Sequence, residues 1–458
     1  MKNNNTIRKI ESIIELVVLT LIYYYVWRNF IFDKQYFWPM VGRGKYVLMG
    51  VYFILVLVIT HLCEGFKYGI LKIADVLFSQ WIAVTIANLV TYLQLSLMAN
   101  VLIPAGPLLG LTLIDFVVQG IFVYTFFAIY NKHSEASRLL MVYGNKESVG
   151  LKLKMDTRED TYNIKKLISV DEGFDAIFKE LENYDGLVIS DVSAEQRNDL
   201  LKHCYMQNIQ TYITPKISDV IIGGGEDIHQ FDTPLVRINT TGLTPEQELV
   251  KRFFDIVLCV IASVVLSPLM LIIAAAIKLE DHGPVFYKQA RVTKDGKVFD
   301  ILKFRSMVED AEQRPATDDD DRITKVGHVI RATRVDELPQ LFNIIKGDMS
   351  IVGPRPERTE HVEKYTEAIP EFEFRSKVKG GLTGFAQIYG KYNTSAYDKI
   401  KLDLMYIENY TFLLDVKLVL MTIRILFKKE STEGFDKVVS ADEILASLEA
   451  EKNKTGDE

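Results

Sequence analysis

Four long apolar runs fill the first third of the chain and predict membrane-spanning helices. The runs cover Ile13–Phe32, Tyr46–Leu62, Val76–Ala99 and Leu108–Tyr130. Each comes close to the roughly 20 apolar residues that a helix needs to cross a bilayer. The first run ends in tyrosine and tryptophan and offers no cleavage site of a signal peptide. We therefore expect an α-helical bundle of four spans over residues 1–137.

The basic residues around these runs predict an orientation. Those that favour a cytoplasmic N-terminus, and cytoplasmic chain after the fourth run, are Lys2, Arg8, Lys9, Lys67, Lys72, Lys132 and Arg138. The loop after the first run opposes this assignment with four basic residues of its own. By the positive-inside rule we expect the chain to return to the cytoplasm after the fourth span.

Residues 138–245 alternate short apolar runs with amphipathic stretches. Leu139–Tyr143, Leu167–Val170, Leu187–Ser190 and Gln210–Ile213 predict buried strands, with helical patterns at Phe174–Leu181 and Glu195–Tyr205 between them. Such alternation predicts a small Rossmann-like α/β domain with a parallel sheet. The turn after the first strand lacks the G-x-G-x-x-G of a dinucleotide site, which favours a regulatory or scaffolding domain without a cofactor.

A second apolar region, Phe253 to Ile277, is interrupted by Ser267-Pro268. Two structures fit this pattern. A fifth span would carry the rest of the chain across the membrane, whereas a re-entrant helical hairpin would return it to the same face. Proline breaks a helix, and a neighbouring hydroxyl can satisfy the freed carbonyl. We expect the re-entrant hairpin over residues 246–280, with Lys251 and Arg252 as anchors at the headgroups.

The stretch Ile323 to Glu357 carries the candidate chemistry. The pattern after Pro339 is helical and ends at Gly347, so we expect a helix to begin at about Asp336. Asp336 and Glu337 would then lie at the positive end of that helix. Arginines near a carboxylate pair suit phosphate chemistry with a metal ion, although Asp336 as a simple helix cap is an open alternative.

Upstream of this stretch, Asp295-Gly296 predicts a hairpin between Val285–Val292 and Lys297–Lys303. Lys303 and Arg305 share one face of the second strand. Two cations on one face suit a phosphate-bearing ligand, and a solvated strand edge is the alternative.

Composition narrows the class of protein. The 458 residues carry a net charge of −7, which argues against a nucleic-acid partner. The three cysteines are far apart and form no C-x-x-C, so neither a disulfide framework nor a zinc site is expected. Residues 431–458 are rich in charge and predict a mobile tail.

The segment from Lys251 to about Phe427 resembles the bacterial sugar transferases, the polyprenyl-phosphate hexose-1-phosphate transferases. The resemblance rests on KRFFD, Ser267-Pro268, GPVFYKQ, KFRSM, DELPQLFNIIKGDMSIVGPRPE and KGGLTGFAQIYGK, in the order of the family. With four spans and an α/β domain in front, the chain is similar to the long form. It departs from many relatives at Lys379–Leu382, where they carry Pro-Gly-Leu, and at Phe385, where tryptophan is common.

This resemblance implies an enzyme in a bacterial plasma membrane with a cytoplasmic, monotopic and mainly α-helical catalytic domain over residues 281–430. It implies transfer of a hexose-1-phosphate from a UDP-sugar to undecaprenyl phosphate, with release of UMP, to begin an exopolysaccharide, capsule or O-antigen unit. Asp336 would be the nucleophile that carries a phosphosugar, and Glu337 would hold Mg²⁺. The residues expected to bind substrate phosphates or the nucleotide are Lys303, Arg305, Arg331, Arg355, Pro354 and Pro356.

Several alternatives stay open at this point. The α/β domain could make the chain a membrane-anchored ligand sensor, or the transfer could proceed without a covalent intermediate. The sugar is undetermined among glucose, galactose and an N-acetylated hexosamine, with glucose or galactose favoured. A homodimer and the pairing of each arginine with a phosphate are also undetermined.

Overall fold

The computed structural model describes residues 2–32, 42–133, 136–145, 149–308, 322–390 and 394–426. These residues form two compact units, which divide between Thr214 and Pro215. The charged tail expected over residues 431–458 lies outside the described residues.

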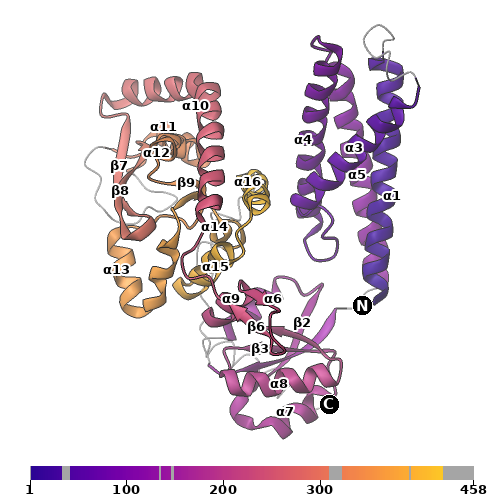
Figure 1. Ribbon diagram of the computed structural model, residues 1–458, viewed down its shortest axis with the longest axis vertical. Coiled ribbons are helices and arrows are strands. Elements are labelled where there is room, and N and C mark those ends of the chain that lie inside the picture. The colour runs from indigo at the N-terminus through magenta and orange to yellow at the C-terminus, as the bar shows by residue number, and fades with distance from the viewer. Residues whose placement is uncertain are drawn as a thin grey trace. The chain divides into compact units, whose positions relative to one another are not determined.

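The first unit begins with long apolar helices (Figure 1). They are α1 (Lys2–Val26) with a π-helical turn at Trp27–Ile31, α3 (Gly44–Leu62), α4 (Ile73–Ala99) and α5 (Gly106–His133). Including α10 of the second unit, five described helices are long and apolar enough to cross a membrane. The predicted group of apolar helices at the N-terminus is therefore present, and the chain is a membrane protein.

Polar side chains are buried between the N-terminal helices. Asp115 is fully buried and accepts a hydrogen bond from the Asn88 amide at 3.0 Å. Glu15 accepts hydrogen bonds from the Tyr68 hydroxyl and, at 3.2 Å, from Gln80. Buried polar groups are costly without partners, so these bonds fix how the helices pack.

The predicted parallel sheet follows these helices. It consists of β1 (Ser137–Tyr143), β2 (Tyr162–Ser169), β3 (Gly186–Ser190) and β4 (Gln210–Ile213) in the order β2-β1-β3-β4, all parallel. Its helices are α6 (Gly150–Asp156), α7 (Phe174–Leu181) and α8 (Ala194–Met206). The predicted alternation of strands and helices is confirmed.

Residues 215–245, expected to belong to the α/β domain, lie in the second unit instead. Ile217 and Val220 of α9 (Ile217–Gly223) and the following Leu243 are buried there, in one core with Phe372 and Leu404. Their apolar side chains find a core in the second unit, which is why the chain changes units before Pro245.

The second unit is a mixed α/β structure with several helices and short strands. Its strands are β5 (Glu226–Ile228), β6 (Leu235–Arg237), β7 (Phe286–Val292), β8 (Val298–Phe304), β9 (Ser350–Val352) and β10 (Gly381–Thr383), paired β5-β6, β7-β8 and β9-β10. Its other helices are α10 (Pro245–Asp281), α11 (Lys325–Ala332), α12 (Gln340–Lys346), α13 (Thr359–Ala368), α14 (Phe385–Tyr389), α15 (Ala396–Glu408) and α16 (Phe412–Leu426). The predicted hairpin is confirmed, since β7 and β8 pair antiparallel around a turn at Asp295-Gly296.

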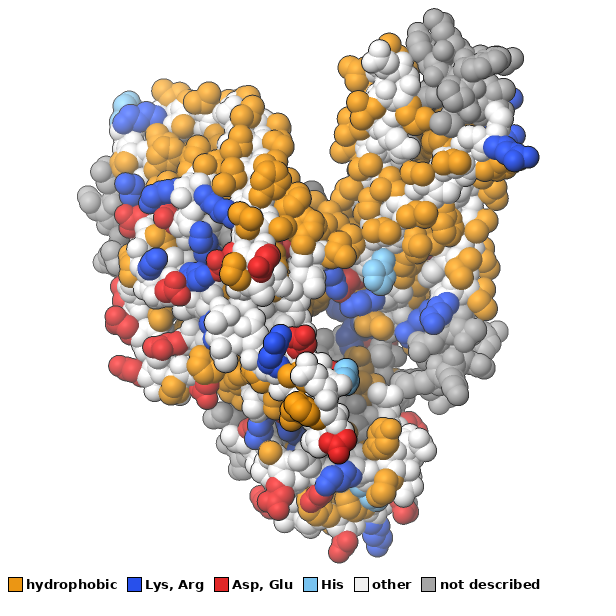
Figure 2. Space-filling model, in the orientation of Figure 1, with side chains coloured by type: hydrophobic (Ala, Val, Ile, Leu, Met, Phe, Trp, Pro, Cys, Tyr) orange, Lys and Arg blue, Asp and Glu red, His pale blue; other side chains and the backbone are white. Residues whose placement is uncertain are grey.

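Helix α10 continues through Pro268 and bends (Figure 1). Proline has no N–H to donate to the Val264 carbonyl, and the Ser267 hydroxyl donates to that oxygen at 2.8 Å instead. A straight helix of 37 residues would measure roughly 55 Å, well beyond the hydrocarbon core of a bilayer. Apolar side chains cover much of the visible surface of α10 (Figure 2). Among the exposed apolar residues of this helix are Val264 and Leu271, which are 68% and 71% exposed.

The expected headgroup anchors, Lys251 and Arg252, both contact other parts of the second unit. The Lys251 ammonium is buried and pairs with Asp415 at 2.6 Å, because Lys251, Asp255 and Cys259 share the helix face that packs inward. Arg252 donates to the carbonyl oxygens at the end of α12. Lys251 is therefore not available to lipid headgroups, and that expectation is wrong for this residue.

Candidate active site

The carboxylate pair lies in a tight turn that precedes α12. Asp336 and Glu337 belong to a 3₁₀ turn, Val335–Glu337, and the α-helix begins only at Gln340. Pro339 has no N–H with which to continue an α-helix backwards, so the chain closes i→i+3 bonds such as Leu338 N–H to the Val335 carbonyl. The expectation of a helix from about Asp336 is therefore wrong by about one turn.

The other end of α12 follows the prediction. Gly347 caps the helix with a φ of 103°, which glycine adopts at little cost. Asn343 of this helix accepts from the Leu302 N–H and donates to the Asp300 carbonyl. Helix α12 is thereby fastened to β8, the strand that carries Lys303.

Glu337 is held by two cations. The Lys303 ammonium lies 2.7 Å and an Arg355 guanidinium nitrogen 3.1 Å from the same carboxylate oxygen. Burial by itself would raise the pKa of Glu337, but the positive charges of Arg355 and Lys303 outweigh it and hold this pKa well below its usual range. Glu337 is therefore ionised at neutral pH.

Asp336 has a different environment. Burial raises the pKa of its carboxyl group, a shift that Lys303 opposes and the charge of Glu337 supports. The Asp336 side chain is 14% exposed, and its nearest charged contact is Lys303 Nζ at 4.0 Å. Within the described residues, no side chain donates a hydrogen bond to Asp336. Two neighbouring carboxyl groups with pKa values pushed apart are typical of a site that gives each a separate role.

Of the predicted cations, three surround the pair and one does not. Lys303 and Arg355 contact Glu337, and Arg331 of α11 is close enough to lower the pKa of Asp336. Arg305 is only 7% exposed and instead donates to Asp281 and, at 2.7 Å, to the Pro284 carbonyl. It therefore joins the end of α10 to β8.

Arg355 enters the site from the loop after β9. Gly353 starts this loop, and a β-carbon there would lie 2.3 Å from the Lys379 carbonyl oxygen, so only glycine fits. Pro354 accepts a hydrogen bond from the Gly381 N–H, and Pro356 accepts one from Arg291 at 3.0 Å. The two prolines thus hold the loop from both sides of Arg355.

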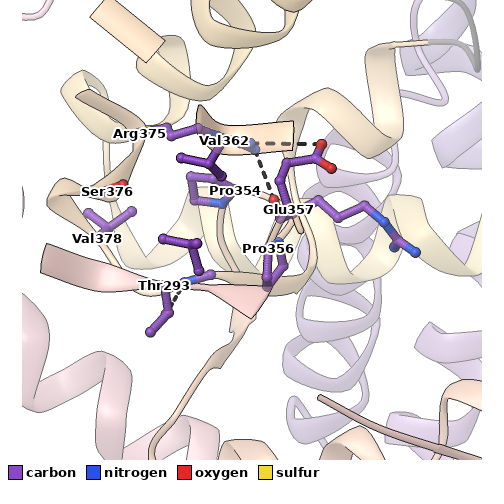
Figure 3. Close-up of a pocket in the computed structure, with 11 residues that line it drawn as sticks. Thr293, Pro354, Pro356, Glu357, Val362, Arg375, Ser376 and Val378 are labelled. Carbon is purple, nitrogen blue, oxygen red and sulfur yellow. Dashed lines mark hydrogen bonds and ion pairs between the residues drawn. The ribbon is translucent and has the colours of Figure 1, made fainter. Parts of the chain in front are cut away.

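A buried charge network, which no sequence motif indicates, supports the same loop. Arg375 donates to the Arg355 carbonyl at 2.9 Å, pairs with Asp403 at 2.8 Å and lies 3.8 Å from Glu357. Figure 3 shows Arg375 directed toward Glu357 across a small hollow beside Pro354 and Pro356. Arg375 comes 20 residues after Arg355, with nothing in its neighbourhood to mark it. This hollow measures about 20 Å³, which is too small for a nucleotide sugar.

The carboxylates of this site can hold a hard cation such as Mg²⁺ only when a substrate supplies further oxygen ligands. The described residues contain no group of three His, Cys, Asp or Glu side chains placed to hold a metal ion. Mg²⁺ nevertheless needs only one or two carboxylates when substrate phosphates and waters complete its shell. The ionised Glu337 meets that requirement, so the chemistry of the site fits Mg²⁺.

Comparisons with known proteins give one consistent result. The sequence profile named "Bacterial sugar transferase" matches residues 246–429. Over 257 residues, 55% of this chain and 58% of the relative, it is 39% identical to a UDP-N-acetylgalactosamine-undecaprenyl-phosphate N-acetylgalactosaminephosphotransferase of Aeromonas hydrophila. It is 35% identical over 257 residues to a UDP-glucose:undecaprenyl-phosphate glucose-1-phosphate transferase of Klebsiella pneumoniae, covering 54% of each chain.

A further relative is covered more fully. The chain is 39% identical over 201 residues to a UDP-glucose:undecaprenyl-phosphate glucose-1-phosphate transferase of Caulobacter vibrioides. That match covers 42% of this chain and 75% of the relative. By contrast, the chain spans only about half the length of the Aeromonas and Klebsiella proteins.

Proposed function

Because the chain belongs to the bacterial sugar transferase family, we propose that it transfers a hexose-1-phosphate from a UDP-sugar to undecaprenyl phosphate. The observation that carries the proposal is the contrast between the two neighbouring carboxyl groups. Glu337 is ionised and held by Lys303 and Arg355, whereas Asp336 keeps its carboxyl group free of hydrogen bonds from described side chains. A carboxylate with few competing donors is the better nucleophile.

The proposed reaction has two steps. An Asp336 oxygen attacks the phosphorus that bears the sugar, the bond between the two phosphates breaks, and UMP leaves. An oxygen of undecaprenyl phosphate then attacks the same phosphorus, and the Asp336 carboxylate is released. Lys303, Arg331 and Arg355 would stabilise the negative charge that develops on the phosphate, and their proximity to the carboxylate pair supports this role. Each substrate can thus visit the same site in turn.

Mg²⁺ is part of the proposal. Glu337, with its low pKa, would hold the ion, which would supply positive charge to the pyrophosphate of the donor substrate. Removal of Mg²⁺ with EDTA should stop UMP release, and Glu337→Gln should raise the Mg²⁺ concentration needed for half-maximal rate. A Glu337→Gln enzyme with an unchanged Mg²⁺ requirement would assign the ion elsewhere.

We further propose that α10 is re-entrant and that the catalytic unit is cytoplasmic. The support is physical: α10 bends (Figure 1), carries Pro268 inside its apolar stretch, and has the freed carbonyl satisfied by Ser267. A re-entrant helix keeps Asp336 on the side where UDP-sugars are made. Undecaprenyl phosphate, which is anchored in the bilayer, then meets a water-soluble donor at one interface.

The decisive test is the nucleophile. Asp336→Asn keeps the side-chain volume but removes the charge, so UMP release should fall by at least about 1,000-fold. The assay is UMP release over a panel of UDP-sugars with undecaprenyl phosphate, which also identifies the sugar. Asp300→Asn, at an exposed position on β8, is the matched control and should keep its activity. If the Asp336→Asn enzyme kept substantial activity, or if no phosphosugar could be trapped on the wild-type protein, transfer would proceed without a covalent intermediate.

A further inference from the structure

A second hollow, larger than the one beside Pro354, lies at the first turns of α10. It has a volume of about 350 Å³, within the range of small-ligand pockets. Its polar wall includes Arg252, Asp255 and Lys379, and its apolar wall includes Leu243, Leu249 and Val378. Arg252 contacts the C-terminal end of α12, whereas Asp336 and Glu337 precede its first residue. The hollow is therefore separate from the carboxylate site.

Most charges around this hollow are already compensated. Lys251 pairs with Asp415, and Lys294 pairs with Glu248. Asp255 is buried and accepts hydrogen bonds from a hydroxyl and an N–H of β9. Lys251 and Lys294 are therefore paired with carboxylates, whereas Asp255 has neutral partners and keeps its negative charge beside the hollow.

Arg252 and Lys379 form no ion pair with a carboxylate among the residues that the structure describes. Arg252 donates to two carbonyl oxygens, at 2.5 and 2.7 Å, which satisfies N–H groups but leaves its charge uncompensated. The Lys379 ammonium has neither an ion pair nor a hydrogen bond with any residue that the structure describes. Partial burial, and then the charge of Arg252, lower the pKa of Lys379. The carboxylates of Asp255 and Glu248 oppose this shift. Because Glu248 already pairs with Lys294, the two cations face one carboxylate without a cationic partner, that of Asp255, and positive charge is in excess here.

The two cations approach one another at Gly347. A β-carbon built on Gly347 would lie 3.3 Å from an Arg252 guanidinium nitrogen and 3.7 Å from the Lys379 ammonium. The absence of a side chain at this glycine leaves room between the cations. An anion placed there could accept hydrogen bonds from both, and such charge-assisted bonds are the stronger kind.

The remaining wall suits an apolar tail. Leu249 lines the hollow and is 73% exposed, and Phe253, one turn further along α10, is 61% exposed. From here the exposed apolar surface continues along α10 (Figure 2). A ligand with its charge between Arg252 and Lys379 would thus find apolar protein surface directly beside it.

We propose that this hollow binds the phosphate of an anionic glycerophospholipid, with Arg252 and Lys379 as its ligands. The phosphodiester would balance the excess positive charge, and the acyl chains would lie along the apolar surface of α10. Bound lipid would fix the point at which α10 enters the bilayer. This inference rests on the membrane location of α10 and not on the transfer reaction, so the two can fail separately.

The test uses the full chain in a neutral detergent. Binding of phosphatidylglycerol and of phosphatidylcholine is titrated by native mass spectrometry for the wild type, Lys379→Ala and the control Lys346→Ala. Lys346 lies at the end of α12, is 74% exposed at its side chain and pairs with Asp348. We expect the wild type and the control to prefer phosphatidylglycerol, and Lys379→Ala to bind it about tenfold more weakly. Thermal unfolding without added lipid shows that each variant is folded.

Four results would overturn the proposal. The first is equal binding of phosphatidylglycerol by the Lys379→Ala variant and the wild type, and the second is equal binding of the two lipids by the wild type. The third is displacement of the lipid by inorganic phosphate, which would assign the pocket to a free anion. The fourth is displacement by undecaprenyl phosphate in a manner that depends on Lys379, which would assign it to the acceptor substrate. UMP release, measured separately, does not enter this judgement.

Discussion

Replacement of Arg375 by methionine should strongly destabilise the second unit. Arg375 and Asp403 are 6% and 1% exposed at their side chains, and Arg375 also holds the Arg355 carbonyl. Removing one member of a buried ion pair leaves the other charge without compensation, at a cost of about 3–5 kcal/mol. For a unit of this size each kcal/mol corresponds to about 2–4 °C, so the unfolding temperature should fall by about 6–20 °C.

The loss should depend on pH. In the wild type, burial raises the pKa of Asp403 and Arg375 opposes that rise. Without Arg375 the pKa rises further above its value in the unfolded chain, so folding takes up a proton and the folded state gains stability as the pH falls. The deficit of the Arg375→Met variant should therefore be smaller at pH 5.5 than at pH 8.

The assay is scanning fluorimetry of the purified full chain at both pH values, with UMP release measured in parallel below the unfolding temperature. Arg237→Met is the matched control, because Arg237 pairs with Glu226 on the surface, where both side chains are more than 65% exposed. Such pairs contribute at most about 1 kcal/mol. The reasoning would be refuted if Arg375→Met unfolded within 2 °C of wild type, a margin taken as roughly the effect of a surface change, or if its deficit grew as the pH fell.

Three further predictions follow from the same contacts. A truncation that begins at Pro215 should be folded and release some UMP, whereas one that begins at Thr244 lacks the core residues Ile217, Val220 and Leu243. The shorter chain should aggregate or unfold at a temperature at least about 5 °C lower, as expected for a loss of about 2 kcal/mol or more. Equal unfolding temperatures would contradict the assignment of residues 215–243 to the second unit. Burial raises the pKa of Asp336, and only the ionised carboxylate attacks. As the pH falls, kcat/KM should therefore begin to decline above the ordinary pKa of an aspartate. A profile that stays flat down to about pH 4 would contradict this role of Asp336. Single cysteines that replace Gln247 or Lys294 in a cysteine-free chain should both resist an impermeant thiol reagent in intact cells and react after lysis. Adding Ser267→Ala and Pro268→Leu should make part of the cysteine at position 294 reactive from outside. Labelling at position 294 from outside without these two substitutions would rule out a re-entrant α10.

The sequence by itself determined the elements whose signal is local. Apolar runs of membrane length gave the N-terminal helices, alternation of buried strands and amphipathic stretches gave the parallel sheet, and Asp295-Gly296 gave the β7-β8 hairpin. The hydrogen bond from the Ser267 hydroxyl to the carbonyl that Pro268 leaves unsatisfied also followed from local chemistry, because the two residues are neighbours in the chain. These features depend on periodicity and on single residues, which a sequence displays directly.

Only the tertiary structure decided which charges meet. The sequence predicts Lys303 and Arg305 on one strand face, yet Lys303 contacts Glu337 and Arg305, just beyond the end of β8, pairs with Asp281. Lys251 pairs with Asp415 across 164 residues, and Arg375 reaches Asp403 and the Arg355 carbonyl from a segment without any motif. The unit boundary near Pro215 was likewise set by which core could bury Ile217 and Val220. Long side chains reach partners that chain folding brings near, and spacing along the sequence carries no record of that proximity.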